Sequence, residues 1–203
     1  MRQLLVVLLL IVVSTTSCNQ NPNCPGLSKK YNSVEKADPS LEEYFSGFRD
    51  TLQAKFKQSG IRHENHMTYR FMFYSAFKCG KSVTFEKFDT NNIRMTVSCI
   101  SCNIDAFECH EYQIKIGSQE WYDLKWLIDE YDFWSEDHFR YKEALDGYTI
   151  TLEGFSPETK NCNSTYNFIG RKNPLNDKVG ALFQEIMELE EFIDFRYNQQ
   201  EYI

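Results

Sequence analysis

The chain is short of positive charge, and this disfavours one large class of partner. Its 22 lysines and arginines are outnumbered by 29 aspartates and glutamates, which gives a formal net charge of −7. No run of basic residues occurs in it. Nucleic acids and anionic membrane surfaces attract proteins through basic stripes or patches. We therefore expect no nucleic-acid partner.

The chain also lacks an apolar run long enough to cross a bilayer, which takes about 20 helical residues. Its longest run, Leu4–Val13, follows the positive charge of Arg2 and precedes small polar residues at 14–17. This order is typical of a secretory signal peptide that is removed on export. We predict that residues 1–17 are such a signal.

The number of cysteines bears on the role of the residue directly after the signal. The chain has seven, and an odd number would leave one thiol over in an oxidising compartment. Cys18 stands directly after the small residues, as the lipid-bearing cysteine of a bacterial lipoprotein does. We therefore predict a lipid on Cys18 that anchors the protein to a bacterial membrane in the cell envelope. A secreted soluble form is the alternative.

Lipidation of Cys18 leaves six cysteines for three disulfides. Their connectivity is open among 15 possibilities. A hairpin turn centred between Thr90 and Asn91 places Ser82 opposite Cys99 and favours a Cys79–Cys99 bridge. The remaining candidates then pair as Cys102 with Cys109 and Cys24 with Cys162.

The hydrophobic pattern indicates one α+β domain over residues 39–203, joined to the anchor by a polar tether at residues 18–38. Apolar residues recur at helical spacing in three segments, and short segments rich in aromatic and β-branched residues lie between them. We predict an antiparallel meander sheet of about six strands packed against two or three amphipathic helices. The expected helices are 41–56, 118–131 and 179–193, and the expected strands are 69–77, 82–88, 93–98, 109–116, 148–155 and 165–170.

A complete catalytic motif is lacking. The segment Gly154–Glu158 misses the final glycine of a nucleophile elbow, and Pro157 follows its serine. The two histidines of His63–His66 are spaced differently from those of a His-Glu-x-x-His zinc site. We therefore predict no catalytic residues, no cofactor and no metal.

Two weaker hypotheses use the cysteines. Cys99 and Cys102 have the spacing of a thiol-disulfide redox pair. With Cys109 and His110 they also resemble a zinc site, but adjacent residues on a strand point to opposite faces, so only one of the last two would bind the metal. Structural disulfides fit an exported protein better than either.

One carboxylate is set apart by its surroundings. Glu153 lies in an otherwise apolar strand, and Arg171 lies at the end of the next strand, where it can form an ion pair with it. Such a pair, with His138 as a further titratable residue, marks a possible cleft. An architectural role is the commoner one.

Several residues in the C-terminal half form a recognisable set: Trp121-x-x-Leu124, Phe133-Trp134, Asp146-Gly147, Leu152-Glu153, Tyr166 and Arg171-x-x-Pro174. With the closing amphipathic helix, this set resembles a pattern in small exported bacterial proteins and lipoproteins of unknown function. The resemblance implies an α+β domain and implies no reaction.

The sequence leaves enzymatic activity open and favours a binding protein. The leading hypothesis is a non-catalytic cell-envelope lipoprotein that binds an unknown protein or small molecule. An envelope hydrolase is the alternative, and a redox protein is a weaker one. A cleft with a titratable pair favours the enzyme, whereas an exposed apolar patch favours binding.

Overall fold

A single sheet organises the part of the chain that the computed structural model describes: residues 39–61, 65–75, 79–100, 109–136, 139–141, 147–159, 163–173 and 177–198. Within these ranges its strand order is β4-β3-β2-β1-β6-β7-β5. Six strands pair antiparallel, and the short β5 runs parallel to β7. The strands are β1 (Met67–Ser75), β2 (Gly80–Lys87), β3 (Ile93–Ile100), β4 (Cys109–Ile116), β5 (Phe139–Tyr141), β6 (Tyr148–Ser156) and β7 (Thr165–Lys172).

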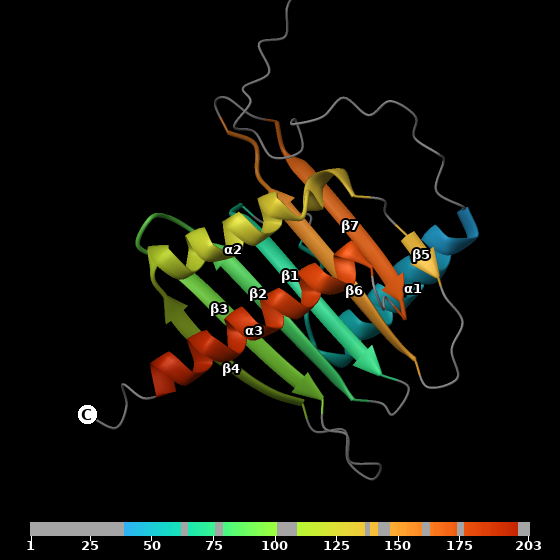
Figure 1. Ribbon diagram of the computed structural model, residues 1–203, viewed down its shortest axis with the longest axis horizontal. Coiled ribbons are helices and arrows are strands. Elements are labelled where there is room, and N and C mark those ends of the chain that lie inside the picture. Colours follow the sequence, from blue (N-terminus) through green and yellow to red (C-terminus); the bar gives the residue numbers. More distant parts are fainter. Residues whose placement is uncertain are drawn as a thin grey trace, which may run out of the picture.

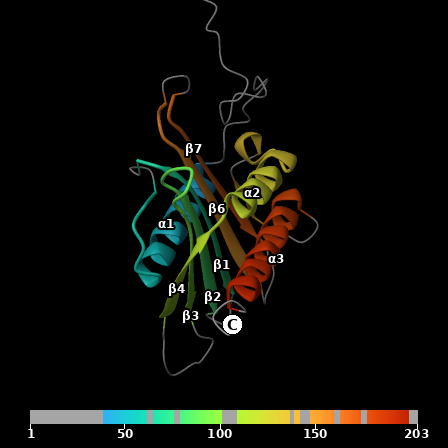
Figure 2. The ribbon, with the colours of Figure 1, turned by 90° about the vertical axis from the view of Figure 1, so that its left-hand side faces the viewer.

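Helices cover both faces of the sheet. Helix α1 (Pro39–Lys55) lies against one face, and α2 (Ser118–Glu130) and α3 (Lys178–Asn198) lie side by side on the other (Figures 1 and 2). A short 3-10 helix, η1 (Phe133–Ser135), follows α2. The α+β class, the antiparallel sheet and its helices are therefore confirmed. No helix in the described ranges is long and apolar enough to cross a membrane.

The strand order departs from the predicted meander in two places. Strands β1 to β4 follow one another across the sheet, but after α2 the chain forms β5 at the far edge beside β7, and it then returns to place β6 beside β1. Glu153 is consequently flanked by Arg70 on β1 and by Phe168 on β7. This central position decides which side chains surround Glu153.

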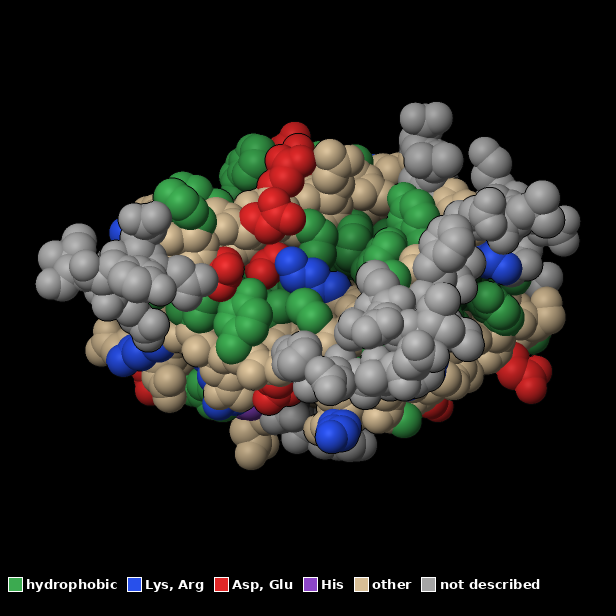
Figure 3. All heavy atoms as spheres, turned by 90° about the horizontal axis from the view of Figure 1, so that it is seen from below, with side chains coloured by type: hydrophobic (Ala, Val, Ile, Leu, Met, Phe, Trp, Pro, Cys, Tyr) green, Lys and Arg blue, Asp and Glu red, His purple; other side chains and the backbone are tan. Residues whose placement is uncertain are grey.

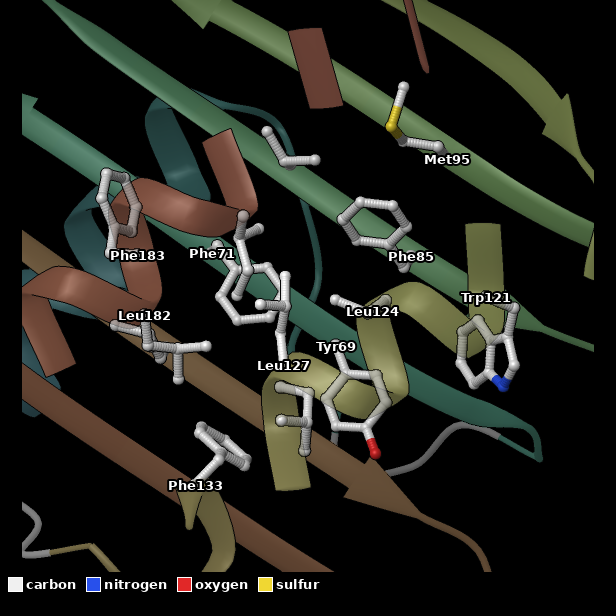
Figure 4. Packing of buried hydrophobic residues seen from close by; sticks show 14 of the residues in the cluster. Tyr69, Phe71, Phe85, Met95, Trp121, Leu124, Leu127, Phe133, Leu182 and Phe183 are labelled. Carbon is white, nitrogen blue, oxygen red and sulfur yellow. The ribbon is translucent and has the colours of Figure 1, made fainter. Parts of the chain in front are cut away.

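The main hydrophobic core lies between the sheet and the pair α2 and α3. Alternate residues of each strand point to one face, and on β1 these are Tyr69 and Phe71. Figure 4 shows them meeting Leu124 and Leu127 of α2 and Leu182 of α3. A smaller core lies under α1 and contains Leu52, Phe56, Met72 and Ile100.

Helix α1 is seated by a close contact. The ring of Phe45 is fully buried and stacks on Phe139 of β5 with 5.4 Å between ring centroids. It also lies directly over Gly170 of β7, where an added Cβ would collide with the ring. Glycine at 170 thus lets the helix approach the backbone of the strand.

The β2–β3 hairpin has a different register from the predicted one. Ser82 faces Ser98, and Cys99 faces Lys81, so the turn is centred on Thr90. Because a shift of one residue moves a side chain to the other face of a sheet, the basis for the predicted Cys79–Cys99 bridge is removed. Among the other cysteines, 18, 24, 102 and 162 and the side chain of 109 lie outside the described residues.

Helix α2 starts at Ser118, as predicted, and no side chain caps its first turn. Gly117 occupies the N-cap position in an extended conformation, and Ser118 is the first helical residue. The Ser118 hydroxyl donates to the Thr90 carbonyl instead of capping the helix, at 3.4 Å. The hydroxyl therefore links α2 to the β2–β3 turn.

Candidate functional site

Glu153 lies at the centre of a buried polar network on the α1 face of the sheet. Its side chain is almost fully buried, and its Oε2 lies 3.9 Å from the guanidinium of Arg70. Tyr166 donates its hydroxyl to Oε1 at 2.8 Å, and Gln53 of α1 donates its amide to Oε2 at 3.1 Å. Each carboxylate oxygen thus accepts a hydrogen bond from within the chain.

Arg70 extends this network beyond α1. It donates to the Ser59 carbonyl at 2.6 Å and to the Thr84 hydroxyl at 3.3 Å. The network therefore connects the sheet both to α1 and to the segment after that helix. Buried charges are tolerated when they are paired and hydrogen-bonded, and these contacts satisfy that condition. They fit an architectural role for Glu153.

The predicted pair of Glu153 with Arg171 is wrong. Arg171 is opposite Ile150 in the register, so it points to the face that carries α2 and α3. Its buried guanidinium contacts Asp177 at 3.2 Å and Glu136 at 3.4 Å. The third residue of the predicted cleft, His138, lies outside the described residues.

A second buried carboxylate lies on the α3 side of the sheet. Glu190 forms an ion pair with Lys81 of β2 and accepts the Tyr112 hydroxyl of β4 at 3.1 Å. Burial, together with the charges of Glu190 and Asp194, raises the pKa of the Tyr112 hydroxyl. Tyr112 therefore stays protonated as a hydrogen-bond donor at neutral pH. Figure 3 views the molecule from below relative to Figure 1, and in it acidic and basic side chains lie next to each other beside hydrophobic ones.

The metal and redox hypotheses gain nothing from the described residues. No group of three histidine, cysteine, aspartate or glutamate side chains among them is placed to hold a metal ion. Cys102 and the side chains of Cys109 and His110 lie outside the described part of the chain. The two hypotheses are therefore untested.

The most unusual surface lies on the outer side of α2 and α3, which faces the viewer in Figure 1. Four large aromatic residues there are each 58 to 65% exposed: Tyr122 and Trp126 on α2, and Phe192 and Phe195 on α3. Tyr122 and Trp126 are one helical turn apart, as are Phe192 and Phe195, and Trp126 and Phe192 line the same groove. We call these four residues the aromatic surface.

A groove of about 360 Å³ between α2 and α3 joins the two halves of the aromatic surface. Its walls carry three carboxylates and no cationic side chain, and are formed by Asp123, Trp126, Leu127, Glu185, Glu188, Leu189 and Phe192. Apolar and aromatic walls with a few charged groups are typical of binding sites. The charge of this groove suits a cationic group.

A second groove, of about 570 Å³, borders the other side of Trp126. Its lining mixes both charges and consists of Met67, Lys87, Trp121, Tyr122, Lys125, Trp126 and Asp129. The Lys87 ammonium lies over the Trp121 and Tyr122 rings, 5.5 and 5.8 Å from their centroids. Lys125 pairs with Asp129 at 3.2 Å. Both lysines here contact aromatic rings or a carboxylate. In the acidic groove, Asp123 and Glu188 accept hydrogen bonds from the neutral amides of Gln119 and Gln184, which do not neutralise their charge.

The sequence contains a signal for this surface in the positions of its aromatic residues on α2 and α3. Residues 121, 124, 127 and 128 form the buried stripe of α2, and Tyr122 and Trp126 fall outside it. Phe192 and Phe195 likewise fall outside the buried stripe of α3, which includes Ile186. Aromatic residues on the polar arc of an amphipathic helix are the pattern to look for.

Neither a scan against protein-family models nor a search of curated proteins found a match to this chain. The resemblance to small exported bacterial proteins therefore stays a prediction. The site rests on the geometry alone.

Proposed function

We propose that this protein is an exported bacterial lipoprotein whose domain is a non-catalytic binding module. In this proposal residues 1–17 are removed, Cys18 carries the lipid, and the aromatic surface contacts the partner. The observation that carries the binding role is the exposure of four large aromatic side chains on two adjacent helices. Monomeric proteins rarely leave contiguous apolar patches of this kind in water unless they bind something.

The charges around the aromatic surface indicate the chemistry of the partner. Asp123, Glu185 and Glu188 surround the groove at its centre. They repel anionic lipid headgroups and attract lysine and arginine side chains. Tryptophan and tyrosine also bind cations through their ring faces. A protein segment that combines basic and apolar residues is the partner we propose.

Export has one independent support besides the apolar run near the N-terminus. Cys79, just before β2, is disulfide-bonded. Disulfides persist in oxidising compartments and are rare in the bacterial cytosol. An envelope location accounts for this bond.

A binding module is preferred over a hydrolase because of the state of Glu153. A catalytic carboxylate needs an oxygen directed at its substrate. Both oxygens of Glu153 instead accept protein donors beneath α1. The described residues thus support binding more than catalysis.

The binding proposal predicts a large effect of replacing Trp126. We expect a peptide of alternating arginine and leucine to bind the domain at physiological salt, and Trp126→Ala to weaken it about 30-fold, as loss of a hot-spot aromatic residue does. Fluorescence anisotropy of a labelled peptide measures the affinity. The matched control is Phe88→Ala, which removes an aromatic residue that is 40% exposed outside the aromatic surface.

A second peptide, with glutamate in place of arginine, separates charge from hydrophobic contact. We expect it to bind far more weakly, and Glu185→Gln to weaken the arginine peptide alone. Equal affinity of the two peptides, or equal affinity of the Trp126→Ala and wild-type domains, would contradict the proposal.

The anchoring proposal predicts that Cys18→Ser changes where the protein is found. The wild-type protein is expected in the membrane fraction, because acyl chains contribute about 0.8 kcal/mol per buried CH₂ group and two or more anchor stably. The variant is expected in the soluble fraction. Intact mass spectrometry checks this, since lipid and the loss of residues 1–17 both change the mass. A soluble wild-type protein that retains residues 1–17 would refute it.

A further inference from the structure

Strand β4 is an edge of the sheet, and its outer side is open among the described residues. All eight of its residues pair with β3, from Cys109 opposite Ile100 to Ile116 opposite Ile93. Within the described ranges no strand pairs with its other side. Figure 2 views the molecule from this side, with α1 and α3 to either side of the strand. The edge therefore presents backbone donors and acceptors of the kind that pair with another strand.

The side chains of β4 are arranged so that the strand is complementary to an antiparallel copy of itself. Glu111, Gln113 and Lys115 are exposed and share one face of the strand. Tyr112 and Ile114 share the other face, toward α3. A negative charge and a positive charge thus stand two residues to either side of Gln113, and an aromatic and a β-branched residue stand one to either side.

We propose that two copies of this chain associate by antiparallel pairing of their β4 strands about a two-fold axis through Gln113. In this register Glu111 of each copy faces Lys115 of the other, so two ion pairs form across the axis. Tyr112 of each copy faces Ile114 of the other on the helix side. Opposite-charge pairs and aromatic pairs with β-branched residues are both favourable across strands.

Other symmetric registers of the same strand are worse. An axis through Glu111 or Lys115 sets like charges directly opposite, which is destabilising. An axis through Tyr112 or Ile114 leaves both charges without an opposite partner. A two-fold contact requires one self-complementary patch, and the axis through Gln113 provides it.

The dimer goes beyond the proposed binding role and does not depend on it. A two-fold axis perpendicular to a continuous sheet places α2 and α3 of both copies on the same side. The two aromatic surfaces then face the same direction. A partner with two suitable segments would gain affinity from binding both.

The test uses the Cys18→Ser full chain, which needs no detergent, and measures its mass by light scattering over a range of concentrations. The wild-type β4 is expected to give a concentration-dependent dimer. In either single variant, Glu111→Lys or Lys115→Glu, residues 111 and 115 carry like charges at both of the symmetry-related contacts across the axis. Each variant is therefore expected to weaken the dimer about tenfold. The double variant reverses both charges and is expected to restore it.

Controls separate this interface from the aromatic surface and from misfolding. Glu185→Lys changes the same charge on α3 and is expected to leave the dimer unchanged, as is Trp126→Ala. Circular dichroism reports whether each variant is folded, and restoration by the double variant excludes a merely unfolded single variant. A monomer at every concentration, a dimer indifferent to the charge reversals, or a double variant that stays monomeric would each overturn the proposal. A dimer abolished by Trp126→Ala alone would place the contact on the aromatic surface instead, and would also overturn it.

Discussion

Replacing Glu153 by leucine is expected to lower the free energy of unfolding by about 3 to 5 kcal/mol, the cost of removing one partner of a buried ion pair. The side chains of Glu153 and Arg70 are only 2% and 7% exposed, so the remaining guanidinium would keep its charge with little water around it. Tyr166 and Gln53 would each lose an acceptor as well. The loss thus exceeds that of a single hydrogen bond, which is typically about 1 kcal/mol.

Urea unfolding followed by circular dichroism measures this effect. The matched control is Glu185→Leu, which removes an exposed glutamate from α3 and is expected to cost little. The double variant Arg70→Met, Glu153→Leu removes both charges and is expected to be close to the wild type, because apolar side chains of similar volume often replace a buried ion pair without loss. A single variant as stable as the wild type would show that the network is not an architectural one.

Replacing Phe45 by alanine is expected to destabilise the protein by about 3 to 5 kcal/mol, the usual cost of truncating a buried phenylalanine. The fully buried ring of Phe45, on α1, packs against Phe139 and the backbone at Gly170. The cavity would lie where α1 packs on β7 and on the edge strand β5. Because α1 also carries Gln53, loosening the helix would expose the network around Glu153.

The measurement is again urea unfolding, with Tyr44→Ala as the control. Tyr44 is the neighbouring aromatic residue of the same helix and is 39% exposed, so its removal leaves no enclosed cavity. We expect the control to lose much less stability than Phe45→Ala. Hydrogen exchange of the α1 amides adds a local readout, and should accelerate in Phe45→Ala. Equal losses for the two variants would show that Phe45 does not anchor α1.

The approximate positions of the long helices and of six strands were predictable from the sequence, because they depend on local patterns, whereas the short β5 was not predicted. The predicted strand 109–116 has the bounds of β4, and the predicted helix 179–193 lies within α3. Alternation and helical spacing report which side of an element faces a core, and both were read within single segments. Helical spacing within the segment 118–131 agrees with the buried positions of Trp121 and Leu124 in α2.

The partners of the charged residues were not predictable in this way, because strand order decides them. The prediction paired Glu153 with Arg171 since their strands are consecutive in the chain. The register of β6 and β7 decides which face of the sheet each residue occupies, and it puts Arg171 on the face opposite to that of Glu153. The ion-pair partner of Glu153 is instead Arg70 on the neighbouring strand β1. Cys99 illustrates the same dependence, because one residue in the length of a turn changed the residue opposite to it.

The sequence by itself determined the class of fold, the approximate positions of its three long helices and six of its strands, and the inward side of each helix, since these depend on the chemistry of near neighbours in the chain. Only the tertiary structure decided that β6 lies beside β1, that Arg70 neutralises Glu153, and that two pairs of aromatic residues from distant helices form one surface. Contacts of this kind join segments far apart in the chain, and no local pattern specifies which of the possible partners is chosen.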